Sequence, residues 1–209
     1  SVTFAAPTTP GLRTVSFVVN DGFKSSVAAT RAISVGQASQ AITFGAQASQ
    51  TFVLNDTFPI FPEATSATPN SGNPIAYSST TGSVCSVIGT TVTMLTAGTC
   101  IVAANQAGDG NFAAAPQVTQ TIAIGVASSS VALSSSPNPS TFAEPVTFTA
   151  TVTGSNPTGT VDFREGATSL CGSPIALVDG SATCVTGALS VGMHSIAASY
   201  LGDANNTPS

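Results

Sequence analysis

The sequence predicts an all-β fold: tandem two-sheet antiparallel β-sandwiches with Greek-key connections and almost no helix. Short runs rich in Val, Ile, Thr and Phe alternate apolar with polar residues and are separated by Gly, Pro, Asn and Ser. No segment of helical length carries apolar residues at i, i+3, i+4 and i+7 between capping residues. Turn residues recur about every 8–12 positions, as is typical of sandwiches.

A repeated phrase predicts the division into domains. The stretch "GTCIVAANQAGDGNF" at 98–112 returns as "GMHSIAASYLGDANN" at 192–206, an offset of 94 residues. "TRAISVG" at 30–36 matches "TQTIAIG" at 119–125, an offset of 89, and both are interpreted as closing strands. The predicted domains are the closing strands of a partial domain, a complete domain, and a domain that lacks its last strand: 1–36, 37–125 and 126–209.

Individual strands follow from period-two alternation. In "PVTFTATVTG" at 145–154, Val146, Phe148, Ala150 and Val152 share one face and threonines occupy the other. This pattern predicts a half-buried strand of an antiparallel sheet. The segment "TVSFVVNDG" at 14–22 predicts a second such strand, which ends in an Asn-Asp-Gly turn.

Composition excludes several classes of function. Charged residues make up only 6% of the chain, and the four basic residues form no stripe that could neutralise phosphates: Arg13, Lys24, Arg31 and Arg164. We therefore expect no nucleic-acid partner. Although 42% of the residues are apolar, no run of about 18 apolar residues exists to cross a bilayer. We expect no membrane insertion.

Four cysteines form two close pairs, each within one repeat. Cys85 and Cys100 lie in the second domain, and Cys171 and Cys184 lie in the third. The chain has no Cys-x-x-Cys and only one histidine, which disfavours zinc. Two local disulfides are the prediction, each worth about 3 kcal/mol in the chain-entropy model. Disulfides indicate an oxidising, extracytoplasmic compartment.

The order of motifs resembles a known family. "SPNP", "PVTFTATV", "GTVDF" and "HSIAASYLGD", all within 126–209, resemble the bacterial Ig-like repeats of large surface-exposed and secreted proteins. Residues 83–112 are similar to cysteine-bearing relatives of that family, and residues 14–35 resemble the last hairpin of a cadherin-like or Ig-like adhesin repeat. The resemblance implies an extracellular sandwich module used as a stalk, fibre or adhesin segment, and it supplies no catalytic motif.

The candidate site residues suit structural roles. His194, the only histidine, would have to serve any Ser-His-Asp triad, but no Gly-x-Ser-x-Gly flanks a serine, so we expect an edge-strand histidine. The turns at 19–23, 107–111 and 201–205 each offer one Asp. Calcium requires 6–8 oxygen ligands, so these aspartates are predicted to bond their own backbone. We expect no metal and no cofactor.

The aromatic residues and the single lysine carry weaker hypotheses. Glycan binding would need exposed aromatic platforms, yet the chain has no Trp and only Tyr77 and Tyr200. The eleven Phe, such as Phe148 and Phe163, are predicted mainly to fill the core, while Tyr77 is left open. Lys24 lies in a turn and is expected to be solvated rather than cross-linked.

These observations predict a structural extracellular protein rather than an enzyme. Two alternatives remain: an adhesin segment that binds a host or glycan ligand, and a non-catalytic spacer of a secreted enzyme. Because the chain begins with Ser and both ends fall inside a domain, we expect either a piece of a longer repeat protein or a fibre subunit. In the fibre, strand 29–36 of a neighbouring copy would pair with the open edge of strand 192–201 and form a head-to-tail filament. The expected partners are therefore copies of this chain or neighbouring Ig-like repeats.

Overall fold

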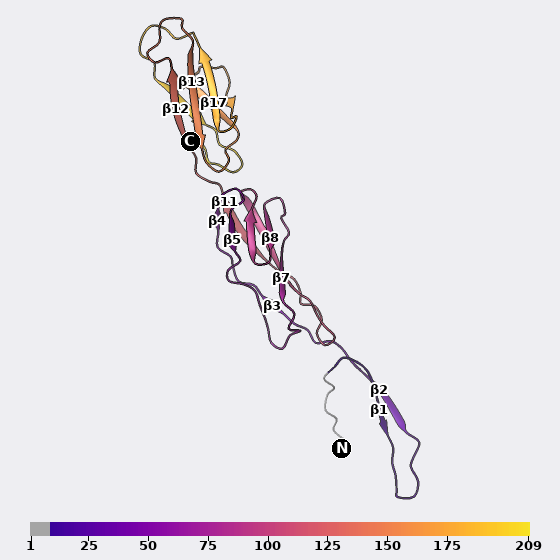
Figure 1. The fold of residues 1–209 in the computed structure, drawn as a ribbon. Coiled ribbons are helices and arrows are strands. Elements are labelled where there is room, and N and C mark those ends of the chain that lie inside the picture. The colour runs from indigo at the N-terminus through magenta and orange to yellow at the C-terminus, as the bar shows by residue number, and fades with distance from the viewer. Residues whose placement is uncertain (1–8) are drawn as a thin grey trace. The chain divides into compact units, whose positions relative to one another are not determined.

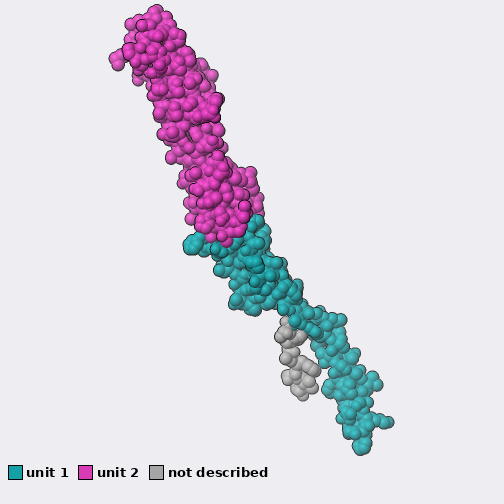
Figure 2. Space-filling model, in the orientation of Figure 1, with its two compact units in different colours: residues 1–46, 61–78, 103–120 teal, residues 47–60, 79–102, 121–209 magenta. Residues whose placement is uncertain are grey.

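The computed structural model describes residues 9–209, and over that range it contains strands and no helix. The predicted all-β fold is thus confirmed (Figure 1). Contacts divide the chain into two compact units (Figure 2): residues 1–46, 61–78 and 103–120, and residues 47–60, 79–102 and 121–209. Of the predicted domains, 126–209 lies wholly in the second unit, and 37–125, here called the middle module, contributes to both.

The first unit begins with a two-stranded hairpin. Strands β1 (Gly11–Phe17) and β2 (Ala29–Val35) pair antiparallel, with Arg13 opposite Ile33. Nearly every residue of both strands is exposed. The strand predicted at 14–22 therefore begins earlier and ends at Phe17, and it is mostly exposed rather than half-buried, since its sheet has two strands among the described residues.

The rest of the first unit is built on short strands. Strands β3 (Ile42–Thr43) and β6 (Thr65–Ser66) pair antiparallel. Ile42 of β3 and Phe44, which directly follows β3, are buried. Ala103 and Ala104, farther along the chain, are buried as well. Alternation of buried and exposed positions at 42–44 shows the one-sided burial expected of a sandwich strand.

A four-stranded sheet uses residues of both units. Its order is β4 (Gln50–Thr51), β11 (Val118–Gly125), β10 (Gly98–Gln106) and β7 (Ile75–Ser79). Strand β4 pairs parallel with β11, while β11 is the closing strand predicted from the repeat at 119–125.

The second unit contains a three-stranded antiparallel sheet of β5 (Thr57–Pro59), β9 (Thr91–Met94) and β8 (Cys85–Ile88). The buried apolar side chains that the middle module contributes to the second unit include Phe52, Ile60, Val92, Met94 and Val102.

Residues 126–209, here called the C-terminal module, form a two-sheet sandwich within the second unit. One sheet has the order β12 (Ser130–Ser136), β13 (Val146–Thr153), β17 (Ser181–Thr186). The other is centred on β14 (Thr160–Glu165), which pairs with β15 (Thr168–Ser169), β16 (Ile175–Ala176) and β18 (Ile196–Tyr200). The chain crosses between the sheets after β13, after β16 and after β17, consistent with the predicted Greek-key connections.

The core of this sandwich confirms the alternation predicted from the sequence. Val146, Phe148, Ala150 and Val152 of β13 are all buried, whereas the intervening threonines are not. They form one cluster with residues of the facing sheet that include Val161, Phe163 and Tyr200. Burial of large apolar side chains between two sheets provides the main free energy that holds the module together.

Strand β18 is an edge strand among the described residues. It pairs with β14 along one side. Along its other side the structure shows one backbone pair, in which Tyr200 and Ser209 exchange N–H···O bonds of 2.8 and 3.1 Å. The same pairing begins the β10–β11 hairpin, where the N–H of Ala115 donates to the carbonyl of Gln106 at 3.0 Å.

Candidate functional site

The repeated Gly-Asp phrase folds into the same turn in both modules. Asp109 Oδ1 accepts the N–H groups of Asn111 and Phe112 at 2.7 and 2.8 Å. Asp203 Oδ1 accepts the two N–H groups at the matching positions, at 2.7 Å each. The predicted role of these aspartates as turn residues is confirmed, because each carboxylate replaces backbone acceptors that the turn lacks.

The third predicted turn, in the β1–β2 hairpin, has the same bonding. Asp21 Oδ1 accepts the N–H groups of Phe23 and Lys24 at 2.9 Å each. These bonds lower the pKa of Asp21. Lys24 is exposed, as predicted. All three sequence phrases thus encode one local structure.

Each turn in the two modules also holds the chain that enters its module. The N–H of Ala38 donates to the carbonyl of Asn111 at 2.8 Å, and the N–H of Ala127 donates to the carbonyl of Asn205 at 2.8 Å. Ala38 and Ala127 are matched by the 89-residue offset of the sequence repeat. The turn therefore fixes where the linker joins the sandwich.

In the C-terminal module, Asp203 is the centre of a larger network. Its Oδ2 accepts the N–H and the hydroxyl of Thr158 at 2.7 and 2.8 Å. Burial alone would raise the pKa of Asp203, but the hydrogen bonds from Thr158, Asn205 and Asn206 outweigh it and lower that pKa far below its ordinary value. Burial and the neighbouring Asp203 carboxylate raise the pKa of Tyr200 to about 12.

Asn205 joins this turn to a loop of the middle module within the second unit. Its Oδ1 accepts the hydroxyl of Thr96 at 2.7 Å and the N–H of Ala97 at 2.8 Å. A second bond runs from the N–H of Leu54 to Ser155 Oγ at 2.9 Å. Sequence reasoning missed this junction, although the recurrence of Asn111 as Asn205 marked the residue.

His194 bridges a loop to a strand rather than activating a serine. Its Nδ1 lies 2.8 Å from Glu165 Oε1, and its Nε2 lies 2.9 Å from the carbonyl oxygen of Ser190. The Ser190 hydroxyl is farther away, at 3.5 Å. The Ser190 carbonyl, together with Glu165, raises the pKa of His194, because both acceptors favour the doubly protonated ring. This geometry favours a structural role.

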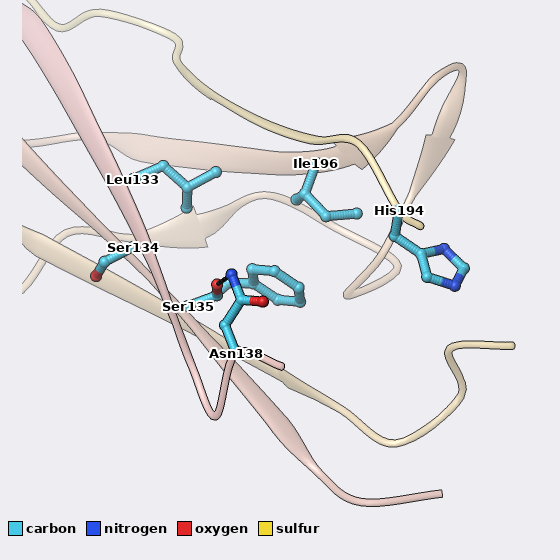
Figure 3. A pocket seen from close by; sticks show the side chains of 7 residues that line it. Leu133, Ser134, Ser135, Asn138, His194 and Ile196 are labelled. Atoms are coloured by element: carbon cyan, nitrogen blue, oxygen red, sulfur yellow. Dashed lines mark hydrogen bonds between the residues drawn. The ribbon is translucent and has the colours of Figure 1, made fainter. Parts of the chain in front are cut away.

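A hollow beside His194 is lined by Leu133, Ser134, Ser135, Asn138, Phe148, His194 and Ile196. Figure 3 shows His194 on one side of it and Ser135 with Asn138 on the other. The amide of Asn138 donates to Ser135 Oγ at 3.2 Å. The Glu165 carboxylate that bonds His194 is not among the described residues that line the hollow.

The four cysteines form the two disulfides that their spacing predicts. Cys85 is joined to Cys100 and Cys171 to Cys184, with Cα–Cα distances of 5.7 and 6.1 Å. Each bridge lies within one predicted domain, and no described cysteine is free. The bridges are the covalent part of both sandwich cores, where Cys85, Cys100 and Cys184 are buried.

The aromatic residues divide differently from the prediction. Tyr77 is partly buried: its ring packs on Phe44 at a centroid distance of 5.6 Å, and its hydroxyl accepts the N–H of Ala64 at 2.7 Å. This geometry gives Tyr77 a packing role. The prediction that nearly all Phe fill the core is wrong for four of them, which are exposed: Phe17, Phe23, Phe61 and Phe142. Phe17 lies on the uncovered hairpin, and the other three lie outside strands.

The basic residues divide between the hairpin and the C-terminal module. Arg13, Lys24 and Arg31 belong to the exposed hairpin segment. Arg164 pairs with the buried carboxylate of Asp162. Within residues 9–209 no cluster of three or more His, Cys, Asp or Glu has the arrangement of a metal site. The described chain also contains no helix of the length and apolarity that a membrane crossing requires.

Comparison with known proteins identifies one part of the chain. Residues 133–209 match the family model described as bacterial Ig-like domain (group 3). No curated protein matches the chain. Among solved structures, the crystal structure of Down Syndrome Cell Adhesion Molecule isoform 1.30.30, N-terminal eight Ig domains, is similar with a TM-score of 0.31 and 9% identity. The match covers 91% of this chain and 32% of the chain of the adhesion molecule.

Proposed function

We propose that this chain, whose residues 133–209 match the family model described as bacterial Ig-like domain, is a structural segment of an extracellular stalk or fibre. The observation that carries the proposal is the junction in the second unit, where Asn205 of one module binds the loop at Thr96 and Ala97 of the module before it. A turn that recurs in each module and binds its neighbour suits a protein built from repeated units in series.

The composition and the disulfides support a location outside the cytoplasm. Both bridges lie within modules, where they stabilise each sandwich separately against proteases and denaturation. Disulfides persist in oxidising compartments. Few charges and a surface of Ser and Thr suit a spacer that interacts little with its surroundings.

The proposal assigns no catalytic role. Both ring nitrogens of His194 lie within hydrogen-bond distance of acceptors, Glu165 and the Ser190 carbonyl, and a general base needs a free ring nitrogen beside its nucleophile. The proposed partners are neighbouring Ig-like repeats rather than a small-molecule substrate.

Head-to-tail assembly by strand addition is the finer form of the proposal. Strands β1 and β18 occupy the same position in the repeat. Strand β2 of one copy would therefore pair antiparallel with β18 of another copy, as β2 pairs with β1 in the same copy. This exchange requires the β1–β2 hairpin to open. Among the described residues, the free side of β18 carries one backbone pair, Tyr200 with Ser209, and the donor strand would pair with the N–H and C=O groups along the rest of that edge.

Two measurements test the proposed function. Cells that produce the protein should display residues 126–209 to an antibody without permeabilisation, and the oxidised chain should resist proteinase K in its two modules. An intracellular location, or complete digestion of the oxidised chain, would overturn the stalk proposal. Filament assembly predicts concentration-dependent polymers by light scattering and electron microscopy, and a monomer at all concentrations contradicts it.

A further inference from the structure

The module junction in the second unit uses two loops at the end of the middle module. One loop contains Leu54, whose N–H binds Ser155 Oγ at 2.9 Å. The other contains Thr96 and Ala97, which both bind Asn205 Oδ1. Each of these residues is half-buried or barely exposed, with Leu54 at 39%.

The C-terminal module carries the same two loops, as backbone geometry shows. The N–H of Asp56 donates to the Val53 carbonyl at 3.1 Å, and the N–H of Glu144 donates to the Thr141 carbonyl at 3.0 Å. The residue before the donor has positive φ in both, 62° at Asn55 and 66° at Ala143. By this match, Phe142 is the counterpart of Leu54.

The second loop matches through a glycine. Gly98 and Gly192 precede equivalent strands, and their φ angles are 141° and 146°. The residues before them are Thr96-Ala97 in the middle module and Ser190-Val191 in the C-terminal module. Both loops therefore present a hydroxyl followed by a backbone N–H, the two donors that Asn205 binds in the junction.

A related loop precedes β1, with Pro10, which has no backbone N–H, at the position of Ala97. Gly11 has a φ of 133° and follows Thr9 and Pro10. Within the first unit, Thr9 and Pro10 line one hollow with Asn111 and Phe112. The loop at Thr9 and Pro10 therefore lies beside Asn111, as the loop at Thr96 and Ala97 lies beside Asn205 in the second unit.

In the C-terminal module the apolar part of the same surface is open to solvent. Phe142 is 74% exposed and Val191 is 84% exposed. Phe142, Ser190 and Val191 line one hollow, so the two loops lie together as their counterparts do. We call Phe142, Ser190 and Val191 the end surface.

We propose that the end surface is a docking site for the Gly-Asp-x-Asn turn of a further Ig-like module that follows in a tandem chain. The Asn side-chain oxygen of that turn accepts the Ser190 hydroxyl and the Val191 N–H, as Asn205 accepts those of Thr96 and Ala97. Docking also covers the exposed Phe142 ring, whose burial adds apolar contact. This inference rests on the proposed stalk function and names the partner of its repeated junction.

The test extends the full chain by one module. Ser209 matches Ala115 through its bond to Tyr200, so the extension appends a second copy of residues 116–209 after Ser209. Residues 116–125 then supply a closing strand beside β18, and the appended 126–209 supplies the turn. The measurement is amide hydrogen exchange at Val191 of the original C-terminal module, and Ala97 serves as the reference for an occupied junction.

We expect the Val191 amide of the original C-terminal module to exchange about fivefold more slowly in the extended chain than in the 209-residue chain, because one hydrogen bond contributes about 1 kcal/mol and about 1.4 kcal/mol corresponds to tenfold. Asn205→Ala in the appended copy should abolish this protection, and Asn205→Asp, which keeps an acceptor oxygen, should retain it. Asn205→Ala in the original copy should release Ala97 and leave Val191 unchanged.

Exchange in the core amides of β13 shows whether the appended module is folded. If it is not, a second extension with residues 116–125 followed by 37–125 presents the Gly108–Asn111 turn instead. Unchanged exchange at Val191 beside a folded added module, with Ala97 still protected, overturns the docking site. That result leaves the stalk function standing, since surface display and protease resistance test it separately.

Discussion

The β1–β2 hairpin and the β10–β11 hairpin are the same element of the repeat, yet only one is buried. Ile33 of β2 is 47% exposed, and its counterpart Ile122 in β11, 89 residues later, is 0% exposed. Both hairpins have alternating apolar residues and a turn organised by an aspartate, Asp21 or Asp109. The difference is that β10 and β11 belong to a four-stranded sheet of a module with a core, whereas within residues 9–209 β1 and β2 pair only with each other.

The comparison shows that alternation identifies a potential core face but does not bury it. A two-stranded hairpin is at best marginally stable in water, and a sheet face becomes a core only when a second sheet covers it. The pairing register and the turn are local and survive without that cover. Substitutions in the two hairpins should therefore differ in cost according to burial.

The largest difference is expected from one substitution made in both hairpins. Ile122→Ala should lower the free energy of unfolding of the middle module by about 2–5 kcal/mol, because it removes buried methyl groups and leaves a cavity. Ile33→Ala should cost less than about 1 kcal/mol, since that side chain is half exposed already. Urea titrations followed by amide exchange give both values. Equal costs would mean that the hairpin is covered in solution.

The fold was largely predictable because its determinants are local in sequence. Period-two alternation located β13, the repeat located β11, and close spacing within one repeat identified both cysteine pairs. Exposure of Phe17 was not predictable, because it depends on which sheet faces the strand rather than on the strand itself.

The candidate site was predictable only in part. The sequence assigned Asp109 and Asp203 to turns, since Gly-Asp is a turn signature. It did not reveal that Asn205 binds Thr96, which lies 109 residues away. A contact between modules leaves no local pattern, and only the recurrence of the asparagine in both copies pointed to it.

Reduction of the disulfides should affect the two modules but not the β1–β2 hairpin, because the hairpin contains no cysteine. Each bridge closes a short loop, so its loss should destabilise its own module by about 3 kcal/mol in the chain-entropy model. Reduction should lower the melting temperature of both modules and leave amide exchange in β1 and β2 unchanged. Complete unfolding of the C-terminal module on reduction would show that Cys171–Cys184, rather than the apolar core, is its main support.

Substitution of the turn aspartates should show a smaller difference in stability cost, with the larger cost again in the module that has a core. Asp203→Ala removes the acceptor of bonds from Thr158, Asn205 and Asn206, and should cost on the order of 2 kcal/mol. Asp21→Ala removes two bonds in an exposed turn and should cost less. Thermal unfolding of the two variants gives the ranking, and the reverse order would contradict the assigned networks.

Asp203 also predicts acid sensitivity of the C-terminal module. Its pKa is lowered in the folded state, so the ionised carboxylate stabilises the module above its unfolded pKa, about 3.9. This stabilisation is lost progressively as the pH falls below that value towards the folded pKa. Acid titration of Asp203→Asn should show a shallower loss of stability between about pH 4 and pH 2 than the unchanged chain. Identical acid profiles would refute this assignment.

The smallest effect concerns one repeat position that holds Arg13 in the hairpin and His194 in the C-terminal module. Each side chain binds the residue four positions earlier: Arg13 binds Thr9, and His194 binds Ser190. Arginine keeps its charge at all accessible pH values, whereas the pKa of His194 is raised above its ordinary 6.5. The protonated ring therefore stabilises the loop at 187–194 fully below pH 6.5, and the contribution is lost as the pH rises through the folded pKa. NMR titration of the His194 ring should give a pKa above 6.5, and Glu165→Gln should lower it, because the charged partner is removed. A pKa at or below 6.5 would mean that the ring does not bridge Glu165 and Ser190 in solution.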